Sequence, residues 1–228
     1  MIPQSSFSNY SNFESYWNYL YPWGPSHKGT ALMLGNSSYH EHIYLNNSVL
    51  TLKATRNNHK LGGKKFNYLS GTIYAKKHIE VNSQYPNYSI CGDFKVPTIK
   101  GTWPAFWITC TTSWPPEVDI LEFKGSTFNN FNIFQIHKNV PTSIDRTNIS
   151  SPNDWNTFCF YMDRINNNDV SLSLSLNNMS IITHNGTGFV LKQFWLIIDL
   201  QMEGSSGNPG PSSDTFYYLR NVKIISNY

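Results

Sequence analysis

Charged side chains are scarce in this chain, since Asp, Glu, Lys and Arg together make up 14% of its 228 residues. The formal net charge is only +3, and the basic residues form no dense patch of the kind that binds phosphates. The sequence therefore predicts no nucleic-acid partner. We interpret Lys60, Lys64 and Lys65 as part of a solvated loop, with contact to an anionic polymer as the alternative.

Long apolar runs are also missing. No run reaches the ~18 residues of a membrane-spanning helix, so no membrane partner is expected. The first five residues, from Met1 to Ser5, lack the basic and apolar segments of a signal peptide. Secretion stays open for a chain from which a leader has been removed.

Cysteine is rare, and its spacing excludes the common metal motifs. Cys91, Cys110 and Cys159 cannot all pair with one another, and none forms a C-x-x-C pattern. Each lies in an apolar stretch. We therefore expect buried free thiols.

Helical periodicity is scarce, whereas aromatic residues make up 15% of the chain. Short apolar or alternating segments, separated by Asn, Gly, Pro and Ser clusters, predict an all-β antiparallel sandwich of two sheets. The segment 170–176 alternates Val or Leu with Ser, so one of its faces packs, and turn formers on both sides predict a meander. Further strands are expected at 70–76, 91–96, 105–109, 118–123, 132–137, 156–162, 195–201 and 217–225.

The remaining segments predict coverings and loops of one domain spanning residues 1–228. Residues 1–30 show no clear periodicity and are expected to wrap the outside of the sandwich. The segment 203–211 is too rich in Gly and Pro for a strand. We expect it to be a loop near a cleft.

The segment from Trp114 to Phe123 places three acids, Glu117, Asp119 and Glu122, among strand-forming apolar residues. In a regular strand Glu122 would point away from the other two acids. One bulge residue after Asp119 would bring it back to their face. The two Glu Cα atoms would then lie roughly 13 Å apart, and their side chains could lean to the ~5–5.5 Å separation of a retaining glycosidase.

In a retaining mechanism one carboxylate attacks the anomeric carbon and the other donates a proton to the leaving oxygen. Asp119 between the two Glu residues would raise at least one pKa and could share a proton with the nucleophile. Two alternatives remain open at this point. The acids could be ordinary outward-facing residues of a half-exposed strand, or they could bind calcium.

Three indoles precede or enter this acidic segment, namely Trp103, Trp107 and Trp114. Indole rings stack on the apolar faces of sugars, while hydroxyl groups pair with carboxylates. The combination favours a sugar-binding cleft over a purely structural cluster.

The segment from Gly101 to Trp107, reading G-T-W-P-A-F-W, and the segment E-V-D-I-L-E from Glu117 to Glu122 together resemble glycoside hydrolase family 16. The likeness extends loosely over most of the chain after about residue 49. It implies a concanavalin A-like jelly-roll sandwich whose concave sheet binds substrate. It also implies that Glu117 is the nucleophile, Asp119 the assisting acid and Glu122 the acid/base.

The same resemblance implies five substrate-binding residues: Trp103, Trp107, Trp114, His137 and Gln201. His137 resembles a histidine often found beside the acid/base, with an ordinary surface histidine as the alternative. No cofactor is required. Many relatives bind a structural calcium partly through an Asp just before the final strand, where this chain has Arg220, and this departure argues against calcium.

The implied activity is hydrolysis of a β-linked polysaccharide, first β-1,3- or mixed β-1,3/1,4-glucan. The five-spaced acid motif resembles the laminarinase and galactanase branches. A galactan hydrolase acting on agar, porphyran or carrageenan is the first alternative, a transglycosylase another. A non-catalytic lectin-like protein is the alternative from a different class. The resemblance also implies an extracellular protein, and we expect a monomer whose partner is its polysaccharide or oligosaccharide substrate.

Overall fold

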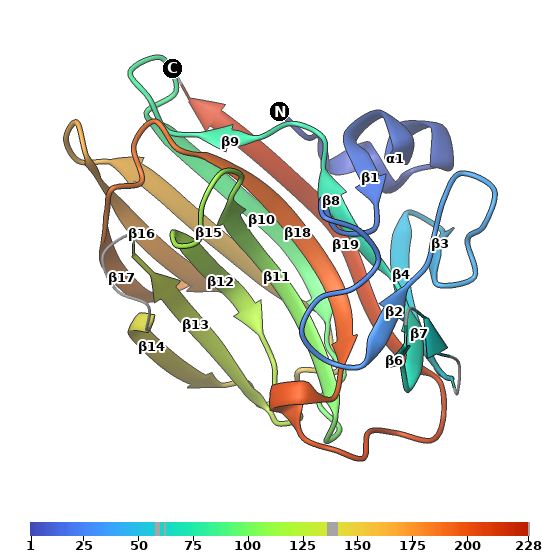
Figure 1. Cartoon of the computed structure of the whole chain (residues 1–228). Helices are drawn as coiled ribbons and strands as arrows, with labels where there is room; N and C mark the ends of the chain where they lie inside the picture. The colour runs from blue at the N-terminus through green and yellow to red at the C-terminus, as the bar shows by residue number, and fades with distance from the viewer. Residues whose placement is uncertain (58–59, 62, 136–140, 228) are drawn as a thin grey trace.

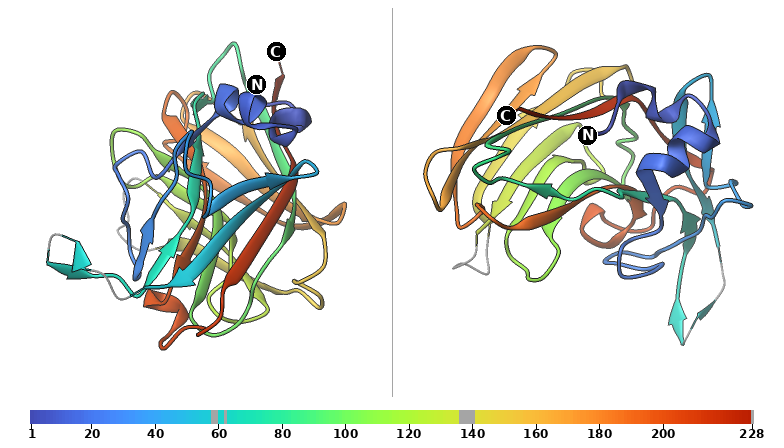
Figure 2. Two further views of the ribbon diagram at one scale, coloured as in Figure 1. Left: turned by 90° about the vertical axis from the view of Figure 1, so that its right-hand side faces the viewer. Right: turned by 90° about the horizontal axis from the view of Figure 1, so that it is seen from above.

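Two β-sheets packed face to face form the framework of the computed structural model (Figures 1 and 2), which describes residues 1–57, 60–61, 63–135 and 141–227. The front sheet contains, in spatial order, β1 (Trp17–Tyr19), β8 (Thr72–Ala75), β18 (Gln193–Met202), β11 (Thr102–Cys110), β12 (Glu117–Glu122), β13 (Phe128–Phe134) and β14 (Pro141–Asn148), with β9 (Ile79–Glu80) paired to β18.

The back sheet has nine strands. Its order is β17 (Met179–Thr187), β16 (Asp169–Leu176), β15 (Asn156–Arg164), β10 (Asn87–Lys95), β19 (Thr215–Asn227), β4 (Val49–Arg56), β7 (Tyr68–Ser70) and β2 (Ala31–Met33), with β3 (Ile43–Asn46) paired to β4. The β2–β7 pair is parallel. A separate hairpin of β5 (Lys60–Leu61) and β6 (Lys64–Lys65) stands away from both sheets (Figure 2).

The alternating pattern of the sequence explains how the sheets meet. On β16, Val170, Leu172 and Leu174 are buried, as predicted, while the serines between them point outward. The β15–β16–β17 run is the predicted meander. Aromatic residues of both sheets meet in the centre, where the rings of Phe94 and Phe106 lie 5.0 Å apart. The strands expected at 70–76, 91–96, 105–109, 156–162, 195–201 and 217–225 each overlap an observed strand. The strand expected at 132–137 begins earlier, at Phe128.

The N-terminal residues do more than wrap the outside, so that prediction was incomplete. After the 3-10 helix η1 (Gln4–Phe7), helix α1 (Tyr10–Tyr16) begins at Asn9, whose side chain accepts a 2.8 Å hydrogen bond from the Asn12 amide. Phe13 is buried, and β1 pairs with β8 at the edge of the front sheet. Residues 20–30 continue across the front sheet and reach the site described below. No helix in the described part of the chain is long and apolar enough to cross a membrane.

The expectation of three free thiols was wrong for two of the cysteines. Cys91 on β10 and Cys159 on β15 lie directly opposite each other, with Cα atoms 4.1 Å apart, and form a disulfide. The pairing depends on the register of two strands separated by 68 residues in sequence. That register could not be derived from the spacing of the cysteines. Cys110 is a buried free thiol, as predicted.

Candidate active site

Strand β12 carries the three acids, and a bulge at Ile120 brings them to one face of the front sheet. Trp107 of β11 pairs with Asp119, whereas the next pair, Phe106 with Leu121, skips Ile120. The predicted inserted residue is therefore Ile120. Because of it, Glu117, Asp119 and Glu122 all line the same hollow.

Asparagines of β13 hold the backbone at this bulge, where regular pairing of β12 with β13 ends at Asp119. The Asn129 side chain accepts a 2.9 Å bond from the Glu122 amide and donates to the Ile120 carbonyl. Asn130 donates a 2.9 Å bond to the Glu122 carbonyl. Side-chain amides of β13 thus bond to the β12 backbone beyond the last regular pair, which fixes the position of Glu122.

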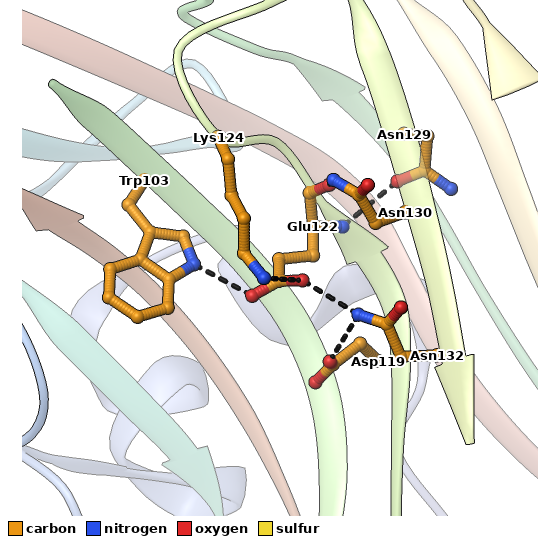
Figure 3. Close-up of polar contacts among 7 residues, drawn as sticks. All are labelled: Trp103, Asp119, Glu122, Lys124, Asn129, Asn130 and Asn132. Atoms are coloured by element: carbon orange, nitrogen blue, oxygen red, sulfur yellow. Dashed lines mark hydrogen bonds and ion pairs between the residues drawn. The ribbon is translucent and has the colours of Figure 1, made fainter. Parts of the chain in front are cut away.

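The Glu122 carboxylate receives donors on both oxygens (Figure 3). Trp103 Nε1 donates a 2.8 Å bond to Oε1, and Lys124 Nζ lies 2.8 Å from Oε2. Asn132 Nδ2 lies 2.8 Å from Glu122 Oε2 and 2.8 Å from Asp119 Oδ2, so one amide links two of the acids. Asp119 and Glu122 are 8% and 5% exposed, and these donors compensate for their loss of solvent.

Burial controls the protonation of the other two acids. It raises the pKa of Glu117 to about 7, against the opposing effects of a hydrogen bond with Thr109 and the charge of Lys28. Burial, followed by the charges of Glu122 and Glu117, raises the pKa of Asp119 well above its ordinary value. Glu117 and Asp119 therefore hold a proton to higher pH than exposed carboxyls do.

Aromatic rings line the cleft on both sides of the acids. It consists of two adjoining hollows of about 250 and 470 Å³, which share Trp107 and Glu117. Trp103 lines the first hollow, and Trp114, which is 49% exposed, lines the second. The structure thus brings all three predicted indoles to one cleft. Aromatic walls beside carboxylates suit a sugar, which presents apolar ring faces and polar hydroxyls.

The N-terminal segment completes this cleft. The His27 ring stacks on Trp107 at 5.7 Å, and Trp23 lies 5.2 Å from His27. Burial, together with the charges of Lys28 and Lys64, lowers the pKa of His27 to about 4. A neutral imidazole therefore faces the cleft near pH 7.

Strand β18 contributes a buried polar floor. Trp107 Nε1 donates a 2.7 Å bond to Asp199 Oδ1, and burial raises the pKa of Asp199 to about 7. Gln201, predicted as a binding residue, also lines the cleft. Its Oε1 accepts bonds from the Ala31 and Met202 amides at 2.8 and 3.0 Å, which hold the side chain in the floor of the cleft.

Sequence reasoning missed several residues of the cleft. Continuing the alternation past the end of β12 could have indicated Lys124, two residues after Glu122. Asn132 lies within a strand that was predicted. No periodic signal marked the N-terminal contribution. The missed residues are Trp23, His27, Lys28, Lys124, Asn132, Trp195 and Asp199. His137 lies outside the residues that the structure describes.

The position compared with a calcium ligand carries a cationic side chain. Arg220 lies within β19 (Thr215–Asn227) rather than just before the final strand, and its Nε lies 3.2 Å from Asp93 Oδ2. Within the described ranges no three His, Cys, Asp or Glu side chains are grouped as a metal site.

A jelly-roll sandwich whose cleft combines three carboxyls with aromatic walls defines this chain as a glycoside hydrolase. A search of family models finds no match. A galactan endo-β-1,3-galactanase from Flammulina velutipes is 40% identical over 234 residues, covering 98% of this chain and 89% of that protein. The chain belongs to glycoside hydrolase family 16.

Other relatives are more distant. An endo-1,3-1,4-β-glycanase from Rhizobium meliloti is 30% identical over 152 residues, covering 65% of this chain and 29% of that protein. An endo-1,3-β-glucanase structure from Streptomyces sioyaensis superposes with a TM-score of 0.72 at 16% identity, covering 94% of this chain and 91% of that chain. A non-specific endo-β-1,3(4)-glucanase of family GH16 gives 0.70 at 16% identity, covering 92% and 84% of the two chains. These structural likenesses confirm the predicted fold.

Proposed function

We propose that the chain is a retaining endo-hydrolase of a β-1,3-linked polysaccharide, with Glu117 as nucleophile and Glu122 as acid/base. The observation that carries the proposal is the bulge at Ile120, which turns both Glu residues and Asp119 to one face within an aromatic cleft. Glu117 attacks the anomeric carbon and forms a glycosyl-enzyme bond as the leaving oxygen takes the proton of Glu122. Glu122 then removes a proton from a water molecule. The oxygen of that water attacks the anomeric carbon, and the bond to Glu117 breaks.

Asp119 assists Glu117 in this proposal. Its raised pKa favours the protonated form, and a protonated carboxyl can donate to the carboxylate of the nucleophile. Asn132 holds Asp119 in place and also contacts Glu122. The indoles of the cleft supply stacking surfaces, with Trp103 fixed by its hydrogen bond to Glu122.

We propose β-1,3-galactan as the first substrate to test, because the full-length relative at 40% identity is named for that activity. β-1,3-Glucan is the second candidate. It is favoured by the names of the endo-1,3-β-glucanase from Streptomyces sioyaensis and of the endo-1,3-1,4-β-glycanase from Rhizobium meliloti. The two polymers differ in the orientation of one hydroxyl, so the floor of the cleft must discriminate between them.

We also propose that the protein acts as one catalytic domain outside the cell and needs no cofactor. The Cys91–Cys159 disulfide supports an extracellular location, because disulfides persist in oxidising compartments. The lectin alternative has no use for three mutually repelling acids on one strand.

The test is release of reducing ends from β-1,3-galactan, laminarin, lichenan, agarose, porphyran and carrageenan, with Glu117→Gln beside the native protein. We expect one β-1,3-linked polymer to be cut and the variant to lose at least ~10³-fold in rate. Binding of a polymer without any cleavage by the native protein would contradict the proposal and support the lectin alternative. Products longer than the supplied oligosaccharide would indicate transglycosylation.

A further inference from the structure

The outer face of the back sheet carries a second groove, away from the acids. On this face Tyr44 of β3 pairs with Thr51 of β4, and Thr51 pairs with Tyr218 of β19. The small side chain of Thr51 therefore lies between two tyrosines. It points away from the core yet is only 2% exposed, because the flanking rings cover it. Burial, with the proximity of Tyr44, raises the pKa of Tyr218.

This notch opens into a hollow of about 450 Å³, a volume typical of ligand pockets. Asn46 and Asn47 line one side of it, and the Trp155 ring lines another. The guanidinium of Arg220 lies 4.2 Å from the Trp155 ring centre, and Asp93 holds Arg220 by an ion pair. The indole is thus fixed in place before any ligand arrives.

The hollow continues into a neighbouring one of about 240 Å³, since Tyr218 and Lys95 line both. The Phe216 ring stacks beside Tyr218 at 6.0 Å and lines the second hollow. The two hollows form a groove across β4, β19 and β10. A groove of this shape fits an extended chain better than a compact small molecule.

We propose that this groove, lined by Tyr44, Asn46, Thr51, Trp155, Phe216 and Tyr218, is a second binding site for the neutral β-1,3-linked polysaccharide that the enzyme cuts, which rests on the proposed function. Aromatic rings and amides are the groups that bind uncharged sugars. Lys95 is the one charged residue among those lining the larger hollow. This composition favours a neutral glycan over a nucleic acid or an acidic membrane.

The groove holds the enzyme on a segment of the polymer other than the segment in the catalytic cleft. The acids lie on the front sheet and the groove on the back sheet. When the groove and the cleft can bind the same polymer molecule, binding in the groove raises the effective concentration of polymer at the cleft. The advantage applies to long polymers and disappears with oligosaccharides that reach only one site.

The test is affinity electrophoresis in gels containing β-1,3-galactan or laminarin, with Glu117→Gln as the uncut background and Tyr218→Ala added to it. We expect Tyr218→Ala to weaken retention by roughly threefold to tenfold. In the otherwise native protein, the same substitution should leave the rate on a short oligosaccharide within about twofold and lower the rate on the polymer. Tyr161→Ala is the matched control, since Tyr161 is 36% exposed on β15 of the back sheet and lies outside the groove. It should change neither readout.

Tyr44→Ala, on the edge strand β3, repeats the experiment if Tyr218→Ala lowers the melting temperature. Polymer retention unchanged in both variants would overturn the groove while leaving the cleft intact. An equal loss of cleavage rate on oligosaccharide and polymer would also overturn it, because that pattern places the effect in the catalytic cleft. If the native protein cuts none of the polymers, the proposed function fails instead.

Discussion

Trp103 and Glu122 face each other across β11 and β12, and the indole Nε1 donates a 2.8 Å hydrogen bond to the carboxylate Oε1. The same indole lines the cleft. One side chain thus forms part of the cleft wall and fixes the orientation of the proposed acid/base. In the proposed mechanism this contact would couple substrate binding to catalysis.

Replacing Trp103 by Phe keeps a ring but removes the donor. We expect kcat to fall roughly 10- to 100-fold with a smaller change in KM, because a hydrogen bond to a charged group contributes about 1.5–3 kcal/mol. Trp195→Phe, at a cleft indole packed against Trp23 and His78, should change kcat by less than about twofold. Steady-state kinetics on a soluble oligosaccharide measure both. A rise in KM with unchanged kcat for Trp103→Phe would show that the bond to Glu122 is not used in catalysis.

We expect the charge of Lys28 to affect the acidic limb of the pH profile of kcat/KM. Its charge lowers the pKa of Glu117, so Lys28→Met should raise that pKa. Because a nucleophile must be ionised, the acidic limb of kcat/KM should move to higher pH, by roughly half a unit or less at an exposed lysine. Lys77→Met, at an exposed lysine outside the cleft lining, serves as control. A shift to lower pH, or an equal shift in the control, would contradict the role of Lys28.

Asp199 makes the folded protein less stable as the pH rises. Burial raises the pKa of Asp199 from 3.8 to about 7 in the folded state, so between these values the folded protein binds more protons than the unfolded chain. The free energy of unfolding therefore falls as pH rises through this interval, by about 4 kcal/mol for a shift of this size.

The substitution Asp199→Asn keeps an acceptor for Trp107 and removes the titration. We expect melting temperatures recorded from pH 4 to pH 8 to fall less steeply for this variant than for the native protein. Asp154→Asn, at an exposed acid, should keep the native slope. Identical slopes for Asp199→Asn and the native protein would contradict burial of an acid with a raised pKa.

The disulfide closes a loop between positions separated by 68 residues. Replacing Cys91 and Cys159 by Ser should lower the free energy of unfolding by about 4 kcal/mol in the chain-entropy model. Chemical denaturation of the variant and of the native protein measures the difference. Dithiothreitol should destabilise the native protein and Cys110→Ala alike, but not the double variant. A double variant as stable as the native protein would show that the bond contributes nothing.

Local patterns predicted much of the framework and the acidic strand. Alternation along 170–176 located a buried face, and the E-V-D-I-L-E spacing predicted the bulge because only a bulge turns Glu122 toward Asp119. The N-terminal contribution could not be predicted in this way. His27 stacks on Trp107 through a contact between distant segments, and its segment carries no periodic signal. Register was equally hidden, which is why the Cys91–Cys159 pairing was missed.

A double displacement by Glu117 and Glu122 would determine the stereochemistry of the first product. A time course of proton NMR spectra during cleavage of β-1,3-galactan, or of laminarin if that is the polymer cut, resolves the anomeric signals before mutarotation. We predict that the β-anomer appears first, because two inversions restore the original configuration. Initial appearance of the α-anomer would contradict it, since a single displacement leaves no nucleophilic role for Glu117.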